Sequence, residues 1–355
     1  MKGLILSGGK GTRLRPLTYT SAKQLVPIAN KPILFYGIEA LVAAGIRDVG
    51  IVVGDTKSEI HKAVGDGSQW GISVTFIEQD APRGLAHAVL ISEPFLGDQP
   101  FVMYLGDNLL ASGIKPLVEE FLAKRPAAQI LLTQVQDPQR FGVAELDGDT
   151  VVRLVEKPKE PKSDLALVGV YLFGSEIFES VKRIKPSLRN ELEITDAIQD
   201  LIDHDKVVRP HIVKGWWKDT GKLEDMLEAN RLILDTLSRQ VEGDVGPECN
   251  IEGKVVIEPG AVIRHSVVRG PAIIGTKTRI EHSYIGPFTS IMNDVEIRGS
   301  ELEHSIVLEG SSLTDLSNRV ADSLIGRNVR IYRQPVKPSA HRFMLGDNSE
   351  VGIQW

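Results

Sequence analysis

The sequence predicts an α/β domain, built as a mostly parallel mixed sheet between helices, followed by a parallel β-helix. Strand-like and helix-like segments alternate through the first half of the 355 residues, which is typical of a parallel sheet covered by helices on both faces. Beyond about residue 241, aliphatic residues recur every six positions, a period typical of β-helices. We therefore divide the chain into residues 1–240, 241–333 and a C-terminal docking tail, 334–355.

Bulk composition excludes several classes of protein. The net charge of −6 argues against a general nucleic-acid binder. Cys249 is the only cysteine, which rules out an intrachain disulfide and a cysteine-based zinc site. No signal peptide and no apolar run of membrane-spanning length is visible, so we expect a cytoplasmic protein with no membrane partner.

The first half alternates strands and helices. Pro32 suits the first turn of a helix that ends near Gly45, and Thr56 with Glu59 predicts a capping box for the next helix. The expected strands are 4–6, 49–53, 74–77, 101–105 and 130–135, and the expected helices include 84–91 and 114–122.

From Phe141 the pattern changes to short strands that extend the sheet, and helices are then expected over 175–184, 194–204 and 222–237. In the repeat region Ser266, Ser283 and Ser300 lie seventeen residues apart. Steps of six, six and five residues close one three-sided coil, and each coil buries its aliphatic residues on the next. The repeat resembles the left-handed β-helix of hexapeptide-repeat proteins.

A glycine-rich loop follows the first strand, in the segment LSGGKGTRLRP at 6–16. Its backbone N–H groups suit an anion such as phosphate, and Arg13 and Lys23 add positive charge. The segment does not match the P-loop, because no glycine is followed by Lys-Ser or Lys-Thr at the required spacing. It does not match the dinucleotide fingerprint either, because the third glycine position holds Leu14. An ordinary tight turn is the alternative interpretation.

Further candidate residues follow strands elsewhere. Asp107 follows a buried strand directly, where a carboxylate is well placed to hold Mg²⁺, and Asp219 in WWKDTG is a second acidic candidate. Lys157 could hold a second phosphate. Gln79 and the turn at Gly84 suit a planar base or a sugar. Each residue taken alone also has a structural explanation, as a turn cap or a solvated side chain.

Nine motifs in a fixed order make the chain resemble the sugar nucleotidylyltransferases, and within them the glucose-1-phosphate thymidylyltransferases of the longer form that carries a β-helix. The motifs are LSGGKGTRLRP at 6–16, AKQLVPIANKP at 22–32, PRGLAHA at 82–88, LGDN at 105–108, RFGV at 140–143, VEKP at 155–158, VGVYLF at 168–173, ELEITD at 191–196 and WKDTG at 217–221. They cover the first two-thirds of the chain, for which the resemblance implies a Rossmann-like nucleotidyltransferase fold.

The resemblance implies a role for each matched residue. Catalysis would rest on Arg13, Lys23, Asp107 and Asp219, with Mg²⁺ held by the two aspartates. The nucleotide would be bound by Gly8, Gly11, Thr12, Arg13, Gln24, Gln79 and Gly84. The sugar phosphate would be bound by Asn108, Gly142, Glu156, Lys157 and the backbone around Leu167. Two positions near the sugar, Phe141 and Val168, depart from the family pattern.

The implied reaction is transfer of a nucleotidyl group from dTTP to glucose 1-phosphate, giving dTDP-glucose and pyrophosphate. UTP is the alternative nucleotide, since thymine and uracil differ by one methyl group, worth about 1–3 kcal/mol in a pocket. The chemistry needs charge neutralisation and alignment rather than a protein nucleophile. The β-helix faces and the apolar tail predict a homo-oligomer.

Two other functions remain open at this point. The β-helix could be an acyl-CoA-dependent transferase that uses a histidine base, because His265, His282 and His304 each precede a serine. Repetition across coils favours a structural turn instead. A non-catalytic regulatory subunit is the third possibility, and the intact charged residues of the motifs argue against it.

Overall fold

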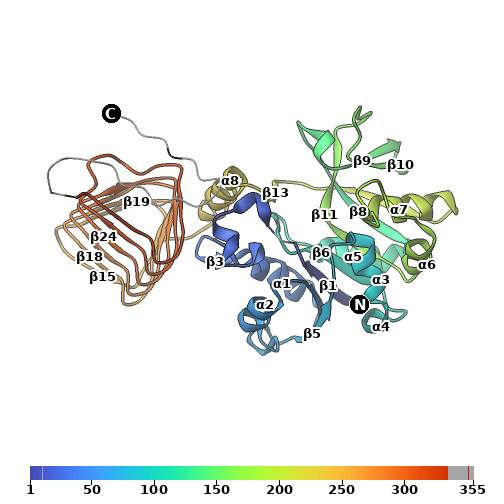
Figure 1. Ribbon diagram of the computed structural model, residues 1–355, viewed down its shortest axis with the longest axis horizontal. Helices are drawn as coiled ribbons and strands as arrows, with labels where there is room; N and C mark the ends of the chain where they lie inside the picture. The colour runs from blue at the N-terminus through green and yellow to red at the C-terminus, as the bar shows by residue number, and fades with distance from the viewer. Residues whose placement is uncertain (10, 335–350, 352–355) are drawn as a thin grey trace. The chain divides into compact units, whose positions relative to one another are not determined.

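The computed structural model describes residues 1–9, 11–334 and 351. The chain forms two compact units that do not divide at a single point in the sequence. Unit 1 comprises residues 1–10, 21–25 and 33–219, and unit 2 comprises residues 11–20, 26–32 and 220–355. The ribbon of both units is drawn in Figure 1.

Unit 1 is organised around a nine-stranded mixed sheet (Figure 1). Strands β6, β1, β4 and β5 are parallel neighbours, and β11 runs antiparallel to both β6 and β8. The strands are β1 (Lys2–Ser7), β4 (Asp48–Val53), β5 (Ser73–Glu78), β6 (Phe101–Leu105), β8 (Ala128–Gln134), β9 (Gly142–Asp147), β10 (Thr150–Glu156), β11 (Leu165–Phe173) and β12 (Val208–Ile212). The expected parallel strands are confirmed, and the later ones extend the sheet as predicted.

Helices cover both faces of this sheet, because alternate residues of its central strands face opposite sides. Leu4 of β1 lies in one hydrophobic cluster with α3, α6 and α7, whereas Ile5 lies in the other with α1, α2 and α5. The helices are α1 (Ile33–Ala43), α2 (Lys57–Val64), α3 (Leu85–Ile91), α4 (Glu93–Leu96), α5 (Lys115–Lys124), α6 (Glu176–Arg183) and α7 (Ile194–Asp203), with short 3₁₀ helices η3 (Lys23–Leu25), η4 (Ser68–Trp70) and η5 (Pro138–Arg140).

The predicted capping box at Thr56 and Glu59 is wrong. Thr56 makes no side-chain cap hydrogen bond. Glu59 instead accepts a hydrogen bond from the backbone N–H of Ala22 at 2.7 Å. This acid therefore fixes the chain just before Lys23 rather than the start of its own helix.

A two-stranded ribbon lies beside the end of β6. Strands β7 (Asn108–Leu110) and β13 (Trp217–Asp219) pair antiparallel, with Asn108 opposite Asp219. The pairing joins two segments that are more than a hundred residues apart, and it places Asp219 opposite the residue that follows Asp107.

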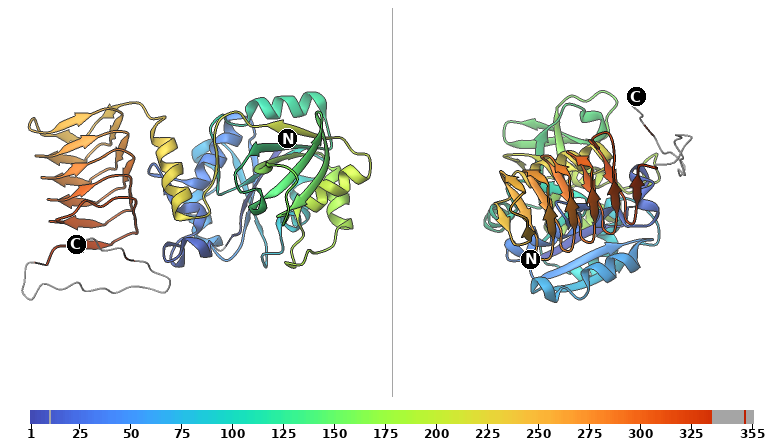
Figure 2. Two further views of the ribbon diagram at one scale, coloured as in Figure 1. Left: turned by 90° about the horizontal axis from the view of Figure 1, so that it is seen from above. Right: turned by 90° about the vertical axis from the view of Figure 1, so that its left-hand side faces the viewer.

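Unit 2 contains the predicted β-helix, in which short parallel strands stack into three sheets (Figure 2). Partner strands in the middle coils are offset by seventeen residues, as in the pairing of Ile263 with Ile280, and strands of the first and last coils depart from this offset by one residue. The aliphatic side chains that point into the coils form one hydrophobic core, which includes Ile257, Ile274, Ile291 and Val307. These observations are consistent with the left-handed form, and the predicted fold class is confirmed.

The strands of the β-helix are two or three residues long. They are β14 (Gln240–Val241), β15 (Asp244–Val245), β16 (Asn250–Glu252), β17 (Val255–Ile257), β18 (Val262–Arg264), β19 (Val267–Arg269), β20 (Ala272–Ile274), β21 (Arg279–Glu281), β22 (Tyr284–Ile285), β23 (Thr289–Ile291), β24 (Glu296–Arg298), β25 (Glu301–Leu302), β26 (Ile306–Val307), β27 (Ser312–Thr314), β28 (Leu324–Ile325) and β29 (Arg330–Tyr332).

Serine hydroxyls tie one coil of the β-helix to the next. Ser266 accepts a hydrogen bond from the N–H of Ser283 at 3.0 Å, and Ser283 accepts one from Ser300 at 3.2 Å. Each hydroxyl also donates to a carbonyl two residues back. The seventeen-residue serine spacing of the sequence is therefore a buried hydrogen-bond ladder at one corner of the coil.

Helix α8 (Leu223–Leu234) and two N-terminal segments belong to the same unit as the β-helix. Strands β2 (Pro27–Ile28) and β3 (Lys31–Pro32) form a tight hairpin, whose Asn30 donates a hydrogen bond to the Ile291 carbonyl at 2.7 Å. The buried Asn230 of α8 accepts hydrogen bonds from Ala29 N–H at 2.9 Å and from Ser290 Oγ at 2.6 Å. The hairpin is thus fastened to α8 and the β-helix.

Two further predictions concern the C-terminal tail and the membrane. The docking tail falls largely outside the described residues, so it stays a prediction. Among the helices that the structure describes, none has the length and apolar character needed to span a membrane.

Candidate active site

The carboxyl ends of β1 and β6 bring the first predicted site residues together in unit 1. Leu6 pairs with Leu105, so Gly8 and Asp107 follow neighbouring strands at matching positions. Ligands of open α/β sheets bind outside such strand ends. The packing at Gly106 is tight, since a methyl group on it would lie 3.0 Å from the carbonyl oxygen of Leu6.

The central feature of the site is a lysine between two carboxylates. Lys23 Nζ lies 2.5 Å from Asp107 Oδ2 and 3.8 Å from Asp219 Oδ1. Lys23 is 7% exposed. Burial raises the pKa of the Asp107 carboxyl, but the charge and hydrogen bond of Lys23 outweigh it, so the pKa is lowered. The lowered pKa keeps the Asp107 carboxylate charged, and with Asp219 it forms a pair of oxygen donors suited to a cation.

Asn108 orients Asp107 rather than facing an open site. Its amide nitrogen donates to Asp107 Oδ1 at 2.8 Å, and its oxygen accepts from Trp217 Nε1 at 2.6 Å and from Gly169 N–H at 3.3 Å. The residue is 2% exposed. The resemblance assigns Asn108 to the sugar phosphate, whereas these contacts commit both ends of its amide to the protein.

Gln24 lies next to Lys23 and is also buried. A methyl group on Gly9 would lie 3.7 Å from its amide nitrogen. Its oxygen is buried, and no described residue donates a hydrogen bond to it. A buried acceptor beside a glycine of the predicted phosphate loop suits a polar group brought by a ligand.

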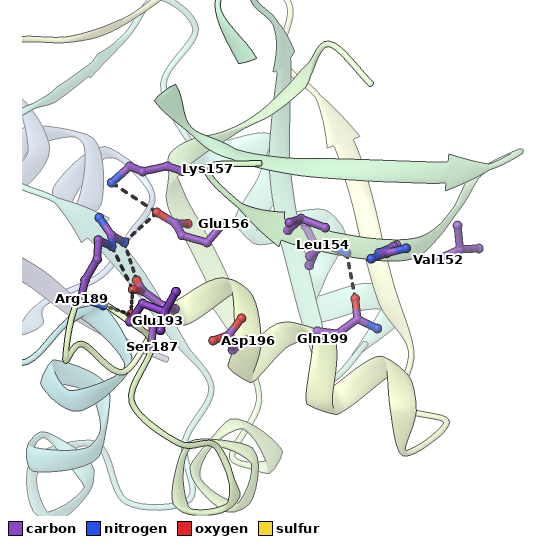
Figure 3. Close-up of a pocket in the computed structure, with 12 residues that line it drawn as sticks. Val152, Leu154, Glu156, Lys157, Ser187, Arg189, Glu193, Asp196 and Gln199 are labelled. Carbon is purple, nitrogen blue, oxygen red and sulfur yellow. Dashed lines mark hydrogen bonds and ion pairs between the residues drawn. The ribbon is translucent and has the colours of Figure 1, made fainter. Parts of the chain in front are cut away.

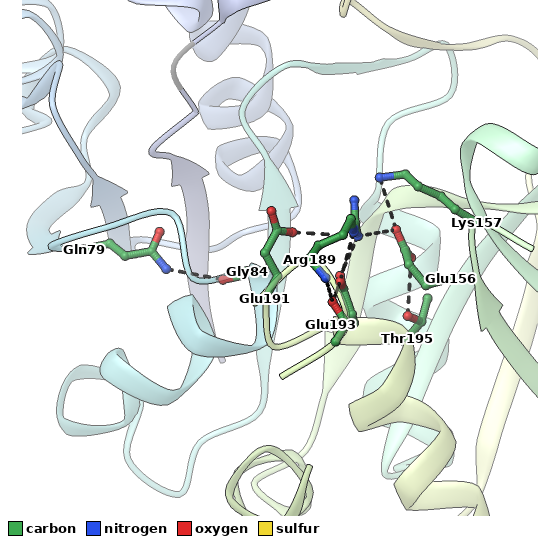
Figure 4. Close-up of polar contacts among 9 residues, drawn as sticks. Gln79, Gly84, Glu156, Lys157, Arg189, Glu191, Glu193 and Thr195 are labelled. Carbon is green, nitrogen blue, oxygen red and sulfur yellow. Dashed lines mark hydrogen bonds and ion pairs between the residues drawn. The ribbon is translucent and has the colours of Figure 1, made fainter. Parts of the chain in front are cut away.

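Gln79, Gly84 and His87 form a second polar group in unit 1. Gln79 Nε2 lies 3.3 Å from the Gly84 carbonyl oxygen (Figure 4). The same nitrogen lies 3.0 Å from His87 Nδ1. Gly84 has φ of 98°, and a methyl group there would overlap the backbone of Leu192. Only glycine fits this close approach between the turn and the ELEITD segment.

The predicted sugar-phosphate residues also come together. A methyl group on Gly142 would lie 2.8 Å from a methyl carbon of Leu167 and 3.2 Å from Glu156 Oε2. Lys157 has an unusual positive φ of 43°, and its Nζ lies 3.4 Å from Glu156 Oε1. A cavity of about 700 Å³ opens beside Glu156 and Lys157, as Figure 3 shows.

Arg189 is the residue of this cavity that the sequence analysis missed. Its guanidinium lies 3.1 Å from Glu156 Oε1 and 2.8 Å from Glu193 Oε2 (Figure 4). Beside it, burial and the charges of Glu193 and Glu156 raise the pKa of Asp196. The available signal for Arg189 was its position two residues before the ELEITD motif. A single exposed arginine, however, belongs to no periodic pattern that would identify it.

The remaining loop residues belong to unit 2. Gly11 has φ of 61°, and its carbonyl accepts a hydrogen bond from Thr18 Oγ1 at 2.6 Å. Thr12 and Arg13 are exposed, whereas Leu14 is 3% exposed. The leucine that breaks the dinucleotide fingerprint is therefore buried in the protein interior. The two polar residues before it stay exposed to solvent.

The histidines of the β-helix occupy turns with positive φ. His265 and His282 stack with ring centroids 4.7 Å apart, at φ of 47° and 49°. His304 lies at a different corner, where its Nδ1 is 2.5 Å from Asp322 Oδ1. This arrangement favours repeated turns of the coil over a shared catalytic base.

Comparisons with known proteins agree with this geometry. A model of the family described as nucleotidyl transferase matches residues 2–236. A glucose-1-phosphate thymidylyltransferase of Streptomyces antibioticus is 56% identical over the full length of both chains. One of Streptomyces griseus is 55% identical over 99% of each.

A solved structure resembles about two thirds of the chain. It is assigned as a glucose-1-phosphate thymidylyltransferase of Bacillus anthracis, in complex with sucrose. It has a TM-score of 0.62 and 39% identity, and the match covers 65% of this chain and 94% of that one. With the full-length relatives and the family match, this shows that the chain belongs to the nucleotidyl transferase family, as a relative of the glucose-1-phosphate thymidylyltransferases.

Proposed function

We propose that the protein transfers a thymidylyl group from dTTP to glucose 1-phosphate, with release of pyrophosphate. The observation that carries the proposal is Lys23 held between Asp107 and Asp219 at the end of β6. Full-length relatives of the same activity support the choice of substrates.

The reaction is an in-line displacement at the α-phosphorus. A phosphate oxygen of glucose 1-phosphate forms the new P–O bond, and the bond from the α-phosphorus to the β-phosphate oxygen breaks. No proton needs to be removed, because the attacking phosphate is already an anion. The protein's task is to hold two anions together and to neutralise charge.

The site residues divide into two groups under this proposal. Gly8, Gly11, Thr12, Arg13, Gln24, Gln79 and Gly84 bind the nucleotide, with Lys23 and Arg13 as its counter-charges. Gly142, Glu156, Lys157 and Leu167 bind the sugar phosphate, and we add Arg189, whose guanidinium faces Glu156 in the cavity. Asn108 acts on this side by orienting Asp107.

The donor set fits Mg²⁺. Among the described residues, no group of three or more histidine, cysteine or acidic side chains could hold a metal alone. Two carboxylates are what Mg²⁺ uses when substrate phosphates and water complete its six ligands. We propose that Asp107 and Asp219 hold it, and that the bound ion neutralises phosphate charge.

Pyrophosphate release tests the proposal. Wild-type protein with Mg²⁺, dTTP and glucose 1-phosphate is expected to release pyrophosphate, and chelation of Mg²⁺ with EDTA is expected to stop it. Asp107→Ala should abolish release. A matrix of dTTP and UTP against several sugar 1-phosphates identifies the preferred pair, and no release from any pair would contradict the proposal.

Three narrower questions accompany this test. UTP is the nucleotide that competes with dTTP, and the matrix of substrates decides between the two. Transfer of an acetyl group from acetyl-CoA would reveal a second activity in the β-helix, which the stacked turn histidines disfavour. We also expect a homo-oligomer, which sedimentation velocity would detect.

A further inference from the structure

The orientation of the Gln79 amide follows from its two neighbours. The carbonyl oxygen of Gly84 can only accept a hydrogen bond, so the Gln79 atom 3.3 Å from it must be the amide nitrogen. The same nitrogen lies 3.0 Å from His87 Nδ1. That ring atom must then be the acceptor, which places the imidazole proton on Nε2.

Both donor hydrogens of Gln79 are consequently used by the protein. Its oxygen has no hydrogen-bond partner among the described residues, and it faces the start of the glycine loop. A methyl group on Gly8 would lie 3.5 Å from this oxygen. The site therefore presents an acceptor and no donor at this point.

We propose that His87 is a positioning residue that sets base selectivity, by locking Gln79 so that only its oxygen meets the base. The proposal rests on the nucleotide site proposed above and deepens it. Its ligand class is a pyrimidine with an imide N3–H, which thymine and uracil have. Cytosine presents a lone pair at N3, which a fixed acceptor repels.

The neutral form of His87 is favoured by its surroundings. Burial lowers the pKa of the imidazole, and the neighbouring charge of Arg83 lowers it further, against the opposing charge of Asp80. A neutral ring keeps the Nδ1 lone pair that the geometry requires. A protonated ring would donate from both nitrogens and would draw the Gln79 oxygen toward itself.

The test compares deoxynucleotides that differ only in the base. We expect wild-type protein to favour dTTP over dCTP in kcat/KM for pyrophosphate release. His87→Leu removes the acceptor and should lower this preference at least about tenfold, the scale of one directed base contact. His87→Asn offers an acceptor oxygen at a similar place and should restore most of it.

An internal control separates selectivity from general damage. Uracil and thymine share the N3–H, so His87→Leu should leave the preference for dTTP over dUTP within about twofold, and the KM for glucose 1-phosphate unchanged. His61→Leu is the matched control, because His61 stacks on Phe76 elsewhere in unit 1. It should leave every ratio as in the wild type.

The outcomes are distinct. If the wild type is active and His87→Leu keeps its preference for dTTP over dCTP, or loses its preference for dTTP over dUTP to the same extent as that for dTTP over dCTP, the role of His87 is wrong while the proposed function stands. If the wild type releases no pyrophosphate from any nucleotide, both proposals fail. A triphosphate of N3-methylthymidine, which lacks the hydrogen, should be a poor substrate of the wild type, and efficient use of it would also overturn the inference.

Discussion

The indole nitrogen of Trp217 donates a hydrogen bond to Asn108 Oδ1 at 2.6 Å and so ties β13 to β7. The same asparagine holds Asp107 through its amide nitrogen. Asp219 follows Trp217 by two residues in the paired strand. This hydrogen bond therefore supports the spacing of the two carboxylates from behind, together with the β7–β13 pairing and Lys23 between them.

Trp217→Phe tests this support. It keeps an aromatic ring against Phe141 but loses the donor to Asn108. Residues behind metal ligands typically change metal affinity about 10–100-fold when they are substituted. We expect the Mg²⁺ concentration for half-maximal pyrophosphate release to rise at least about tenfold. Trp216→Phe is the matched control, and an equal effect of both variants would contradict the assignment.

Arg13→Ala should lower turnover without changing the fold. Arg13 is exposed, so its loss removes no buried contact. One charged group that stabilises a developing anion is worth about 10²–10³-fold in kcat. Arg15→Ala is the control, because Arg15 is also exposed and stacks on Tyr19. Steady-state kinetics measures the turnover of both variants, and circular dichroism checks that both keep the fold. Unchanged turnover in Arg13→Ala would require another function for the loop.

Base selectivity should depend on pH if His87 locks Gln79. The pKa of His87 is lowered by burial and by Arg83 and is raised by Asp80. The preference for dTTP over dCTP should therefore be constant above about pH 6.5 and should fall only at lower pH. The ratio of the two kcat/KM values cancels the titration of the phosphates. His87→Asn should show no such fall, and an identical profile in that variant would contradict the mechanism.

Asn230→Ala should destabilise unit 2. Asn230 is fully buried and has hydrogen bonds with Ala29, Ser290 and Phe288. Buried groups that lose a partner cost about 1–3 kcal/mol each, so we expect a loss of about 2–4 kcal/mol. Calorimetry of thermal unfolding measures it. Asn250→Ala, which removes an exposed contact to Glu252, should shift the transition little.

Periodic patterns carried most of the fold prediction. The β-helix was visible because inward residues repeat with the coil, and Ile263 lies seventeen residues before Ile280. The central sheet was visible because a strand buried on both faces is continuously apolar, as in β4. The fold was therefore predictable wherever a local repeat reflects burial.

The site was predicted less completely, because its geometry depends on contacts between distant segments. Asp107 and Asp219 were both identified, but nothing local shows that Lys23 lies between them. Asn108 was assigned to the sugar phosphate from its motif, and nothing local shows that its side chain also contacts Trp217, 109 residues away. Glu59 suited a helix cap and instead binds Ala22. Such pairings leave no periodic signal in the sequence.

The hairpin fastened by Asn230 has a consequence for the order of folding. Ala29 binds a residue 201 positions later, and Asn30 binds one 261 positions later. At synthesis rates of about 5–20 residues per second, these partners leave the ribosome about ten seconds to a minute after the hairpin. A segment made early in synthesis is thus among the last to reach its final contacts, and a nascent chain stalled before α8 would carry the hairpin without its anchorage.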